Sequence, residues 1–212
     1  MVTECIRVAI ADDHAVVRTG YRRLLELEAG IEVVAEFGDT DVAYGWLTRH
    51  EADVLILDLS MPGRGGLETL HRLGSRLPGL RVLVFSMHDS PALVAQALKA
   101  GACGYLTKSS PPDTLVDAVR LVMRGERPLS DDVRDALGQI GGRRAEVPHL
   151  GLSPREFDVF RLLAQGQQVD EIAGQLFLSV KTVANYQTML RKKMGLGNAL
   201  EMHRYAREHG LI

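Results

Sequence analysis

Five polar residues occur in this 212-residue chain where a phosphoryl-transfer site would need them. Asp12 and Asp13 follow one apolar run, Asp58 follows a second, Ser86 ends a third, and Lys108 comes directly after a fourth. Clustered carboxylates repel one another and require a cation, and all-oxygen ligands favour Mg²⁺. A carboxylate beside Mg²⁺ can attack a phosphoryl group to form an aspartyl phosphate. The ammonium and the hydroxyl can then stabilise the phosphoryl oxygens.

Each of these residues also has an ordinary explanation. Asp12 or Asp13 could cap a following helix, and Asp58 could be a turn residue. Ser86 could simply end a strand, and Lys108 could be a solvated surface charge. The combination favours a site, because all five stand at the ends of apolar strands.

The apolar, β-branched runs alternate with helical stretches through residue 124. We predict strands at Ile6–Ala11, Ile31–Phe37, Val54–Asp58, Leu80–Ser86 and Cys103–Thr107, and helices at 14–28, 40–50, 66–76, 91–100 and 112–124. This alternation predicts a doubly wound α/β domain with a five-stranded parallel sheet. In such a sheet the carboxyl ends of the strands meet at one edge, which would bring the five polar residues together.

Residues 6–124 resemble a receiver domain, whose fold is flavodoxin-like, over the whole of this region. The resemblance is carried by Asp12-Asp13, by Val-Leu-Ile-Leu-Asp58 with Met61-Pro62-Gly63 after it, by Ser86 and by Lys108. Two departures are Gly65-Gly66, where many receivers have Asp-Gly, and Ser109, where many have Pro after the lysine.

The resemblance implies a role for each residue of the pocket. Asp58 would be the phosphoacceptor, and Asp13 and Asp58 would hold Mg²⁺ with the Ser60 backbone carbonyl, Asp12 acting through water. Ser86 and Tyr105 would be a switch pair. On phosphorylation Ser86 would move toward the phosphoryl group and the Tyr105 ring would turn inward. Alternatively, Tyr105 could be an ordinary aromatic residue of an edge strand.

The rest of the chain predicts a linker and a small helical domain. We place the N-terminal domain at 1–125, the linker at 126–148 and the C-terminal domain at 149–212. The linker is rich in glycine and proline, including Gly141 and Gly142, with room for one short helix around Ser130–Ile140. In the tail we expect helices from the Ser153 capping box to about 165, and at 170–176, 179–194 and 198–209.

The helix that starts at Ser179 has a face suited to a DNA major groove. Its predicted contact residues are short and polar in the middle with lysines at the ends: Lys181, Thr182, Ala184, Asn185, Thr188 and Lys192. Asn185 could pair with adenine, and Ala184 could touch a thymine methyl. An ordinary solvated face would give the same stripe, so the stripe alone does not decide between the two.

The whole tail resembles the LuxR/NarL-type helix-turn-helix. The matching segments are 152–156, 162–166, 170–173 and 178–183. The resemblance implies a recognition helix from Ser179 and a dimerisation surface on the last helix, with Leu200 and Tyr205. Tyr186 and Ala184 replace a histidine and a basic residue common in the family. Segments 33–38, 88–94 and 96–98 resemble UhpA-like regulators of sugar-phosphate uptake.

These resemblances together imply a two-component response regulator of the NarL/FixJ type. A sensor histidine kinase would phosphorylate Asp58, and the protein would then form a homodimer on double-stranded promoter DNA. We expect no enzyme activity beyond slow autodephosphorylation. A regulator that works without phosphorylation is disfavoured by the intact pocket, and one acting only by protein contact leaves the helix-turn-helix unexplained. A dehalogenase-like phosphatase would need a second aspartate at position 60, which is Ser60.

Composition agrees with a cytoplasmic regulator that has no membrane association. Apolar residues form 46% of the chain, and the N-terminus lacks the pattern of a signal peptide. The part from Leu150 onward carries 8 basic and 6 acidic residues, and the remainder 17 and 21, so the mildly basic half is the predicted DNA-binding half. Cys5 and Cys103 are expected to be reduced thiols, and no cysteine and histidine cluster has zinc spacing.

Overall fold

The computed structural model describes residues 5–140 and 148–212. The linker glycines Gly141 and Gly142, and the first four residues on which the signal-peptide argument partly rests, lie outside the described residues. Cys5 and Cys103 are both free, as expected. Within the described part of the chain, no helix has both the length and the apolar character needed to cross a membrane.

The N-terminal domain is built on one parallel sheet with the strand order β2-β1-β3-β4-β5. The strands are β1 Ile6–Ala11, β2 Ile31–Phe37, β3 Val54–Leu57, β4 Arg81–Ser86 and β5 Gly104–Thr107. All four neighbouring pairs are parallel. This order belongs to the flavodoxin-like doubly wound folds. The predicted fold class is therefore confirmed, and the strand ends differ from prediction by one residue.

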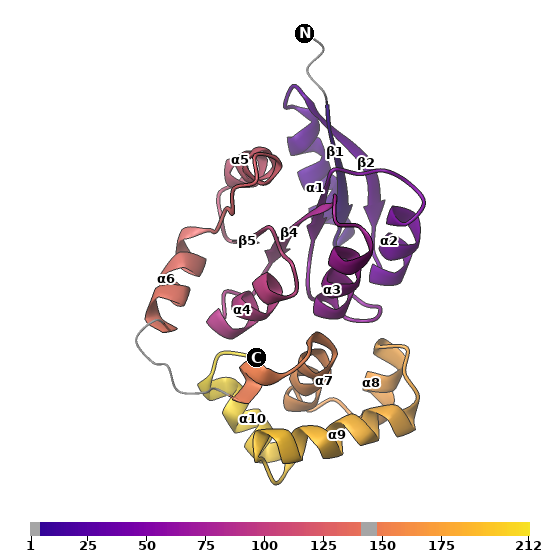
Figure 1. Cartoon of the computed structure of the whole chain (residues 1–212), viewed down its shortest axis with the longest axis vertical. Coiled ribbons are helices and arrows are strands. Elements are labelled where there is room, and N and C mark those ends of the chain that lie inside the picture. The colour runs from indigo at the N-terminus through magenta and orange to yellow at the C-terminus, as the bar shows by residue number, and fades with distance from the viewer. Residues whose placement is uncertain (1–4, 141–147) are drawn as a thin grey trace.

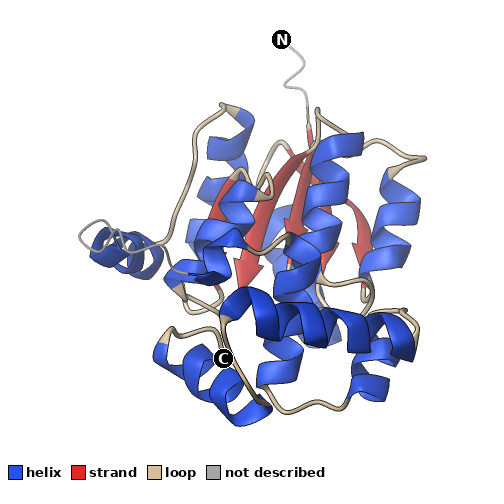
Figure 2. Ribbon diagram, turned by 60° about the horizontal axis from the view of Figure 1, so that its bottom comes forward, coloured by secondary structure: helices blue, strands red, loops and turns tan. Residues whose placement is uncertain are grey.

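Helices cover both faces of this sheet (Figures 1 and 2). They are α1 Ala15–Glu26, α2 Thr40–Leu47, α3 Gly66–Arg76, α4 Pro91–Lys99 and α5 Pro112–Met123. Alternate residues of β1 enter different cores: Val8 and Ile10 pack with α1 and α5, whereas Ala9 and Ala11 pack with α2, α3 and α4. Both faces are buried, which explains why the strands read as continuous apolar runs.

The linker contains the predicted short helix, α6 Asp131–Ile140. This helix is attached to the N-terminal domain. Leu129 forms an isolated parallel bridge with Tyr105 of β5, and Val133 is fully buried. The Asp132 carboxylate accepts a 2.6 Å hydrogen bond from the Thr107 hydroxyl. The start of the linker therefore extends the edge of the sheet beyond β5.

The C-terminal domain is helical, as predicted. It consists of the 3-10 turn η1 Pro148–Gly151 and helices α7 Pro154–Ala164, α8 Val169–Gln175, α9 Val180–Met194 and α10 Ala199–Glu208. The Ser153 capping box is present, with the Ser153 hydroxyl accepting from the Glu156 amide and the Glu156 carboxylate accepting from the Ser153 amide. Helix α9 ends at Gly195, whose φ of 67° is left-handed and suits glycine.

The two domains pack directly against each other. Helix α7 lies on the side of the N-terminal domain and contacts α3, while α9 lies on the outer side (Figure 1). The buried Gln96 side chain of α4 donates a 2.9 Å hydrogen bond to the His149 carbonyl of η1. One continuous apolar core joins α3 and α4 to Phe157 and Phe160 of α7.

Candidate functional site

The predicted pocket forms at the carboxyl edge of the sheet. Asp12 follows β1, Asp58 follows β3 and Lys108 follows β5, so the parallel topology brings all three together. The Lys108 ammonium lies 2.6 Å from an oxygen of Asp12 and 2.6 Å from an oxygen of Asp58. All three side chains are nearly inaccessible, at 7% exposure for Lys108, 5% for Asp12 and 2% for Asp58. A buried lysine therefore neutralises two buried carboxylates.

The protonation of Lys108 follows from this arrangement. Burial alone would lower the pKa of Lys108, because a charged ammonium loses its hydration. The hydrogen bonds to Asp12 and Asp58 outweigh burial and raise the pKa of Lys108 above its ordinary value. The lysine is thus a permanent cation at neutral pH, placed where a phosphoryl group on Asp58 would carry negative charge.

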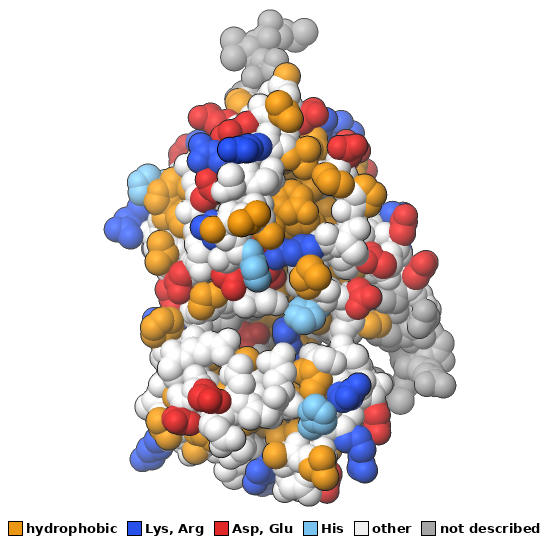
Figure 3. Space-filling model, turned by 180° about the vertical axis from the view of Figure 1, so that it is seen from behind, with side chains coloured by type: hydrophobic (Ala, Val, Ile, Leu, Met, Phe, Trp, Pro, Cys, Tyr) orange, Lys and Arg blue, Asp and Glu red, His pale blue; other side chains and the backbone are white. Residues whose placement is uncertain are grey.

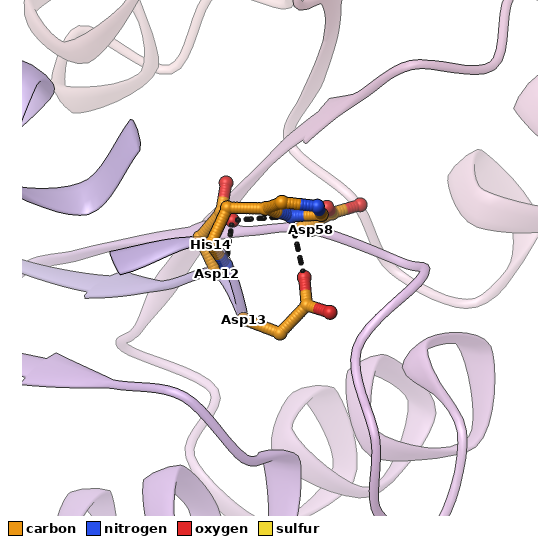
Figure 4. Close-up of side chains that lie close together, drawn as sticks. All are labelled: Asp12, Asp13, His14 and Asp58. Atoms are coloured by element: carbon orange, nitrogen blue, oxygen red, sulfur yellow. Dashed lines mark hydrogen bonds and ion pairs between the residues drawn. The ribbon is translucent and has the colours of Figure 1, made fainter. Parts of the chain in front are cut away.

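Asp13 and a residue that sequence reasoning overlooked complete the acidic cluster. One ligand atom from each of Asp12, Asp13, His14 and Asp58 lies within 4.8 Å of the others. Figure 4 shows the four side chains converging, with His14 Nδ1 2.8 Å from an oxygen of Asp13. Three carboxylates at this spacing provide the oxygen donors that a magnesium ion prefers. His14 was missed because nothing in its spacing indicates that its ring folds back onto the aspartates.

The loop after β3 holds Asp58 through the backbone. The Ser60 amide donates a 3.0 Å hydrogen bond to Asp58 Oδ1, and Ser60 itself is exposed. At Gly66 the chain passes so close to Leu59 that a Cβ would lie 2.5 Å from the Leu59 carbonyl oxygen. Gly66 is required here because only glycine lets the two backbone segments approach this closely.

Ser86 and Tyr105, the predicted switch pair, meet at the loop between β4 and α4. The Ser86 hydroxyl accepts a 3.3 Å hydrogen bond from the His88 amide, and the Tyr105 hydroxyl donates a 2.7 Å hydrogen bond to the His88 carbonyl. The Tyr105 ring is fully buried, so in this structure it already occupies the inward position. Burial raises the pKa of Tyr105, which keeps the hydroxyl a hydrogen-bond donor. The movement of this pair on phosphorylation stays a prediction.

Helix α9 presents the predicted DNA-reading stripe to solvent. Five of the six predicted residues are exposed: Lys181, Ala184, Asn185, Thr188 and Lys192. The sixth, Thr182, is half-buried, and its amide and hydroxyl both contact the Ser179 hydroxyl that caps the helix. The opposite face buries Val183, Leu190 and Met194 in the domain core. The stripe is thus available to a groove, with Thr182 closer to a capping role.

The proposed dimer surface on α10 is only partly exposed. Leu200 is 76% exposed, whereas Tyr205 is half-buried and faces the domain interior. The Tyr205 hydroxyl lies 2.8 Å from His149 Nδ1, and its ring packs against Phe160 and His209. Tyr205 therefore holds η1 to α10, and Leu200 is the large apolar residue of this helix that is exposed at the surface.

Two family models match the chain, one for each domain. Residues 8–120 match the response regulator receiver domain, and residues 150–206 match the luxR family of bacterial regulatory proteins. The chain is a LuxR-type response regulator. The two models leave unmatched the segment that holds α6 and the residues between α6 and η1.

Curated relatives match the regulator over nearly its whole length. It is 44% identical over 200 residues to the transcriptional regulatory protein UhpA of Escherichia coli K12, covering 94% of this chain and 96% of UhpA. It is 37% identical over 208 residues to the response regulator UvrY of the same organism, covering 97% of this chain and 95% of UvrY. The resemblance to UhpA-like regulators is thus supported along the whole chain.

Solved structures of RcsB, a response regulator of Salmonella typhimurium, share both domains with this regulator. One matches with a TM-score of 0.77 at 31% identity, covering 98% of this chain and 99% of the other. A second structure is of RcsB bound to promoter P1flhDC with the phosphomimetic BeF3-. It matches with a TM-score of 0.73 at 32% identity, covering 96% of this chain and 98% of the RcsB chain. The regulator is thus a DNA-binding protein of two-component signalling that controls transcription in response to phosphorylation.

Proposed function

We propose that Asp58 is the residue phosphorylated in this regulator and that a sensor histidine kinase is the phosphoryl donor. In this step an Asp58 carboxylate oxygen attacks phosphorus, the bond to the kinase imidazole nitrogen breaks, and the imidazole leaves. The observation that carries the proposal is the position of Lys108, whose ammonium lies 2.6 Å from Asp58. That cation offsets the negative charge that a phosphoryl group adds beside two carboxylates.

The acidic cluster fits Mg²⁺ as the cofactor of this step. Asp13 and Asp58 would hold the ion with the Ser60 carbonyl, and Asp12 would act through a water molecule. All are hard oxygen donors, and Asp13 is open to solvent, which suits an ion that keeps several waters. When bound, Mg²⁺ would supply charge that draws the donor's phosphoryl oxygens toward Asp58. Lys108 and the Ser60 amide meanwhile hold the carboxylate in place.

The C-terminal domain is proposed to bind promoter DNA as a homodimer, with α9 in the major groove. One RcsB structure, which matches this chain with a TM-score of 0.64 at 32% identity, is of two dimers bound to two parallel DNAs. In the regulator the outward face of α9 carries two lysines, at its first turn and near its end, with Asn185 between them. That is the arrangement of phosphate contacts around a base contact.

A labelling experiment tests the assignment of Asp58. Full-length regulator is incubated with Mg²⁺ and radiolabelled acetyl phosphate, and Asp58→Asn is compared with Asp113→Asn. Asp113 is an exposed aspartate in the first turn of α5, so its variant controls for the loss of one carboxylate. Asp58→Asn should lose the label, while Asp113→Asn should keep it, and mild base should release the label as expected for an acyl phosphate. Labelling that survives in Asp58→Asn refutes the proposal.

A further inference from the structure

We propose that Asp132, in the linker helix α6, is a positioning residue for Lys108 in the phosphorylation of Asp58. Its carboxylate holds the turn that carries Lys108 and so fixes the place from which the ammonium reaches the acceptor. The inference rests on the proposed function of Asp58. It goes further, because Asp132 lies outside the residues that either family model matches.

The linker reaches the acceptor pocket by pairing with the outer edge of the sheet (Figure 1). The Tyr105 amide of β5 donates a 2.9 Å hydrogen bond to the Pro128 carbonyl, and the Ser130 amide donates a 3.1 Å hydrogen bond to the Tyr105 carbonyl. The next amide along that edge, on Thr107, donates to the Ser130 hydroxyl at 3.2 Å. Because this pairing is parallel, α6 begins beside the end of the strand from which Lys108 continues.

Lys108 lies in a tight turn directly after β5. Its amide continues the sheet with a 2.8 Å hydrogen bond to the Ser86 carbonyl, and the Ser110 amide closes the turn on the Thr107 carbonyl at 3.1 Å. The strand itself ends at Thr107. The position of the turn therefore depends on contacts from outside the sheet.

Asp132 supplies such contacts to the residues on both sides of Lys108. One carboxylate oxygen accepts a 2.6 Å hydrogen bond from the Thr107 hydroxyl and lies 3.3 Å from the Ser109 hydroxyl. The Thr107 hydroxyl has a single proton, which it gives to Asp132, so in its 2.8 Å contact with Ser109 the Ser109 hydroxyl donates. A proline at position 109, as in many receivers, has no hydroxyl for this contact. Thr107 and Ser109 are thus joined to each other and to one carboxylate.

The carboxylate of Asp132 is itself fixed and ionised. Its other oxygen accepts a 2.9 Å hydrogen bond from the Val133 amide, and the fully buried Val133 anchors this turn of α6 in the receiver core. Burial alone would raise the pKa of Asp132, but hydrogen bonds with Ser130, Thr107 and Val133 outweigh burial and lower the pKa. Hydrogen bonds to an ionised acceptor are about twice as strong as those between neutral groups.

The neighbouring residue shows what an ordinary aspartate in the first turn of a helix does. The Asp131 side chain is 93% exposed, and it pairs with Arg134 of the same helix at 2.8 Å. Such a residue complements the helix dipole without contacting the sheet. Asp132 instead has its hydroxyl partners at the end of β5, so a role at the helix start does not account for its position.

The contact of Asp132 is separate from the interface between the two domains. Figure 3 shows the hollow at that interface from behind, and the residues that line the cavity come from the loops after β3 and β4 and from the segment 158–176. Asp132 contacts the opposite side of the receiver pocket, at the end of β5. Its replacement therefore tests the pocket and leaves the residues of the domain interface unchanged.

The position of Lys108 matters most while charge develops on the transferred phosphoryl group. The Lys108 ammonium lies 2.6 Å from Asp58 and must reach the phosphoryl oxygens as the new bond between oxygen and phosphorus forms. A cation stabilises such charge best when it is held in place beforehand. A misplacement of about 1 Å can cost about 10²-fold in rate. Asp132 reduces that loss by holding the turn from which the lysine stem extends.

The first test measures the initial rate of Asp58 labelling by radiolabelled acetyl phosphate in the full chain with Mg²⁺. Asp132→Ala should label about ten-fold more slowly or worse, within the range that a misplaced group can cost. Asp132→Asn keeps an oxygen for the two hydroxyls and should stay nearer to the wild type than to Asp132→Ala. Asp131→Ala removes the exposed neighbour and should leave the rate unchanged. A wild-type rate in Asp132→Ala, or equal rates in Asp132→Asn and Asp132→Ala, overturns the proposal.

The second test approaches the same contact from the strand. Thr107→Val removes the hydroxyl and keeps a side chain of similar shape, so it should also slow labelling. The double variant of Thr107→Val and Asp132→Ala should be no slower than Asp132→Ala alone, because both substitutions remove one shared contact. If the two effects multiply in the double variant, the residues act independently and the proposal is overturned.

The third test separates positioning from a general loss of stability. It measures amide hydrogen exchange in the full chain without Mg²⁺ or a phosphodonor. In Asp132→Ala the Lys108 and Ser110 amides should exchange about ten-fold faster, because the turn opens locally. The Asp58 amide, which donates to the Ala11 carbonyl at 2.9 Å inside the sheet, should keep its protection. Unchanged exchange at Lys108, or equal acceleration at Lys108 and Asp58, overturns the proposal.

The two proposals fail in different ways. If Asp58 is not the acceptor, Asp58→Asn keeps its label and the proposed function falls first. If Asp58→Asn loses its label while Asp132→Ala labels like the wild type, the phosphorylation site stands and only the role of Asp132 is refuted.

Discussion

Replacement of Lys108 by methionine tests whether one buried ammonium holds the acceptor pocket together. Each contact of the ammonium, at 2.6 Å, corresponds to about 6 kcal/mol of attraction at an effective dielectric constant of about 20. Desolvation of the three buried groups offsets most of this, and breaking buried ion pairs costs about 3–5 kcal/mol. The oxygen of each aspartate that does not contact Lys108 accepts a hydrogen bond from a backbone amide, that of His14 for Asp12 and that of Ser60 for Asp58. We therefore expect Lys108→Met to lower the free energy of unfolding by about 3 kcal/mol, near the lower end of this range.

The loss should depend on pH in a defined direction. The raised pKa of Lys108 means that its contribution to stability is complete below pH 10.5, the value in the unfolded chain, and is lost as pH rises through the folded value. In Lys108→Met no ammonium faces the two buried carboxylates, so this contribution is absent at every pH. The destabilisation relative to the wild type should therefore be largest near pH 7 and should shrink as the pH rises above 10.5.

The chain offers a clean assay for this effect. Trp46 is the only tryptophan and lies in α2 of the receiver, so its fluorescence reports on that domain. Urea unfolding in EDTA gives the free energy of unfolding at pH 7 and at about pH 11, with Lys192→Met as the control for removal of an exposed lysine. Mg²⁺ at a hundred times its Kd should raise the free energy of unfolding of Lys108→Met by about 2.7 kcal/mol.

Two results would refute this reasoning about Lys108. One is a free energy of unfolding at pH 7 equal to that of the wild type, which would mean that the ammonium does not neutralise the pocket. The other is an equal loss at both pH values, which would point to packing of the lysine stem as the cause.

Three further predictions follow from other parts of the chain. Asn185→Ala should weaken binding to a specific promoter site by about 1–3 kcal/mol, and an unchanged footprint would reject Asn185 as a base-reading residue. Gly66→Ala should lower the free energy of unfolding by about 1–3 kcal/mol through its clash with the Leu59 backbone, whereas Gly79→Ala, where a Cβ meets nothing within 4 Å, should change little. Burial lowers the pKa of His149 to about 4, so this neutral imidazole stabilises the fold above pH 6.5 and loses that contribution as pH falls toward 4. Calorimetry across that range should show a flatter pH dependence in His149→Gln, and equal slopes would refute the assignment.

The acceptor site could be predicted from the sequence because it follows from topology. Asp12, Asp58 and Lys108 each stand directly after an apolar run, and parallel strands bring their carboxyl ends to one edge whatever the packing details. The same holds for α9, where the spacing of Val183 and Leu190 determines which face is buried and therefore which face is left for DNA.

The tertiary structure alone decided the contacts between side chains that are distant in sequence. Arg161 meets His88 across 73 positions, and nothing in the apolar pattern of α7 distinguishes Arg161 from a solvated arginine. The inward position of Tyr205, which the sequence suggested as a surface residue, likewise depends on His149 reaching it from a separate segment. Periodicity specifies which face of an element is buried, but docking of one element on another is determined by the shapes of all the packed side chains together. For this reason the sequence predicted the cluster of Asp12, Asp58 and Lys108 and the exposed face of α9, while the contacts between the two domains became visible only in the tertiary structure.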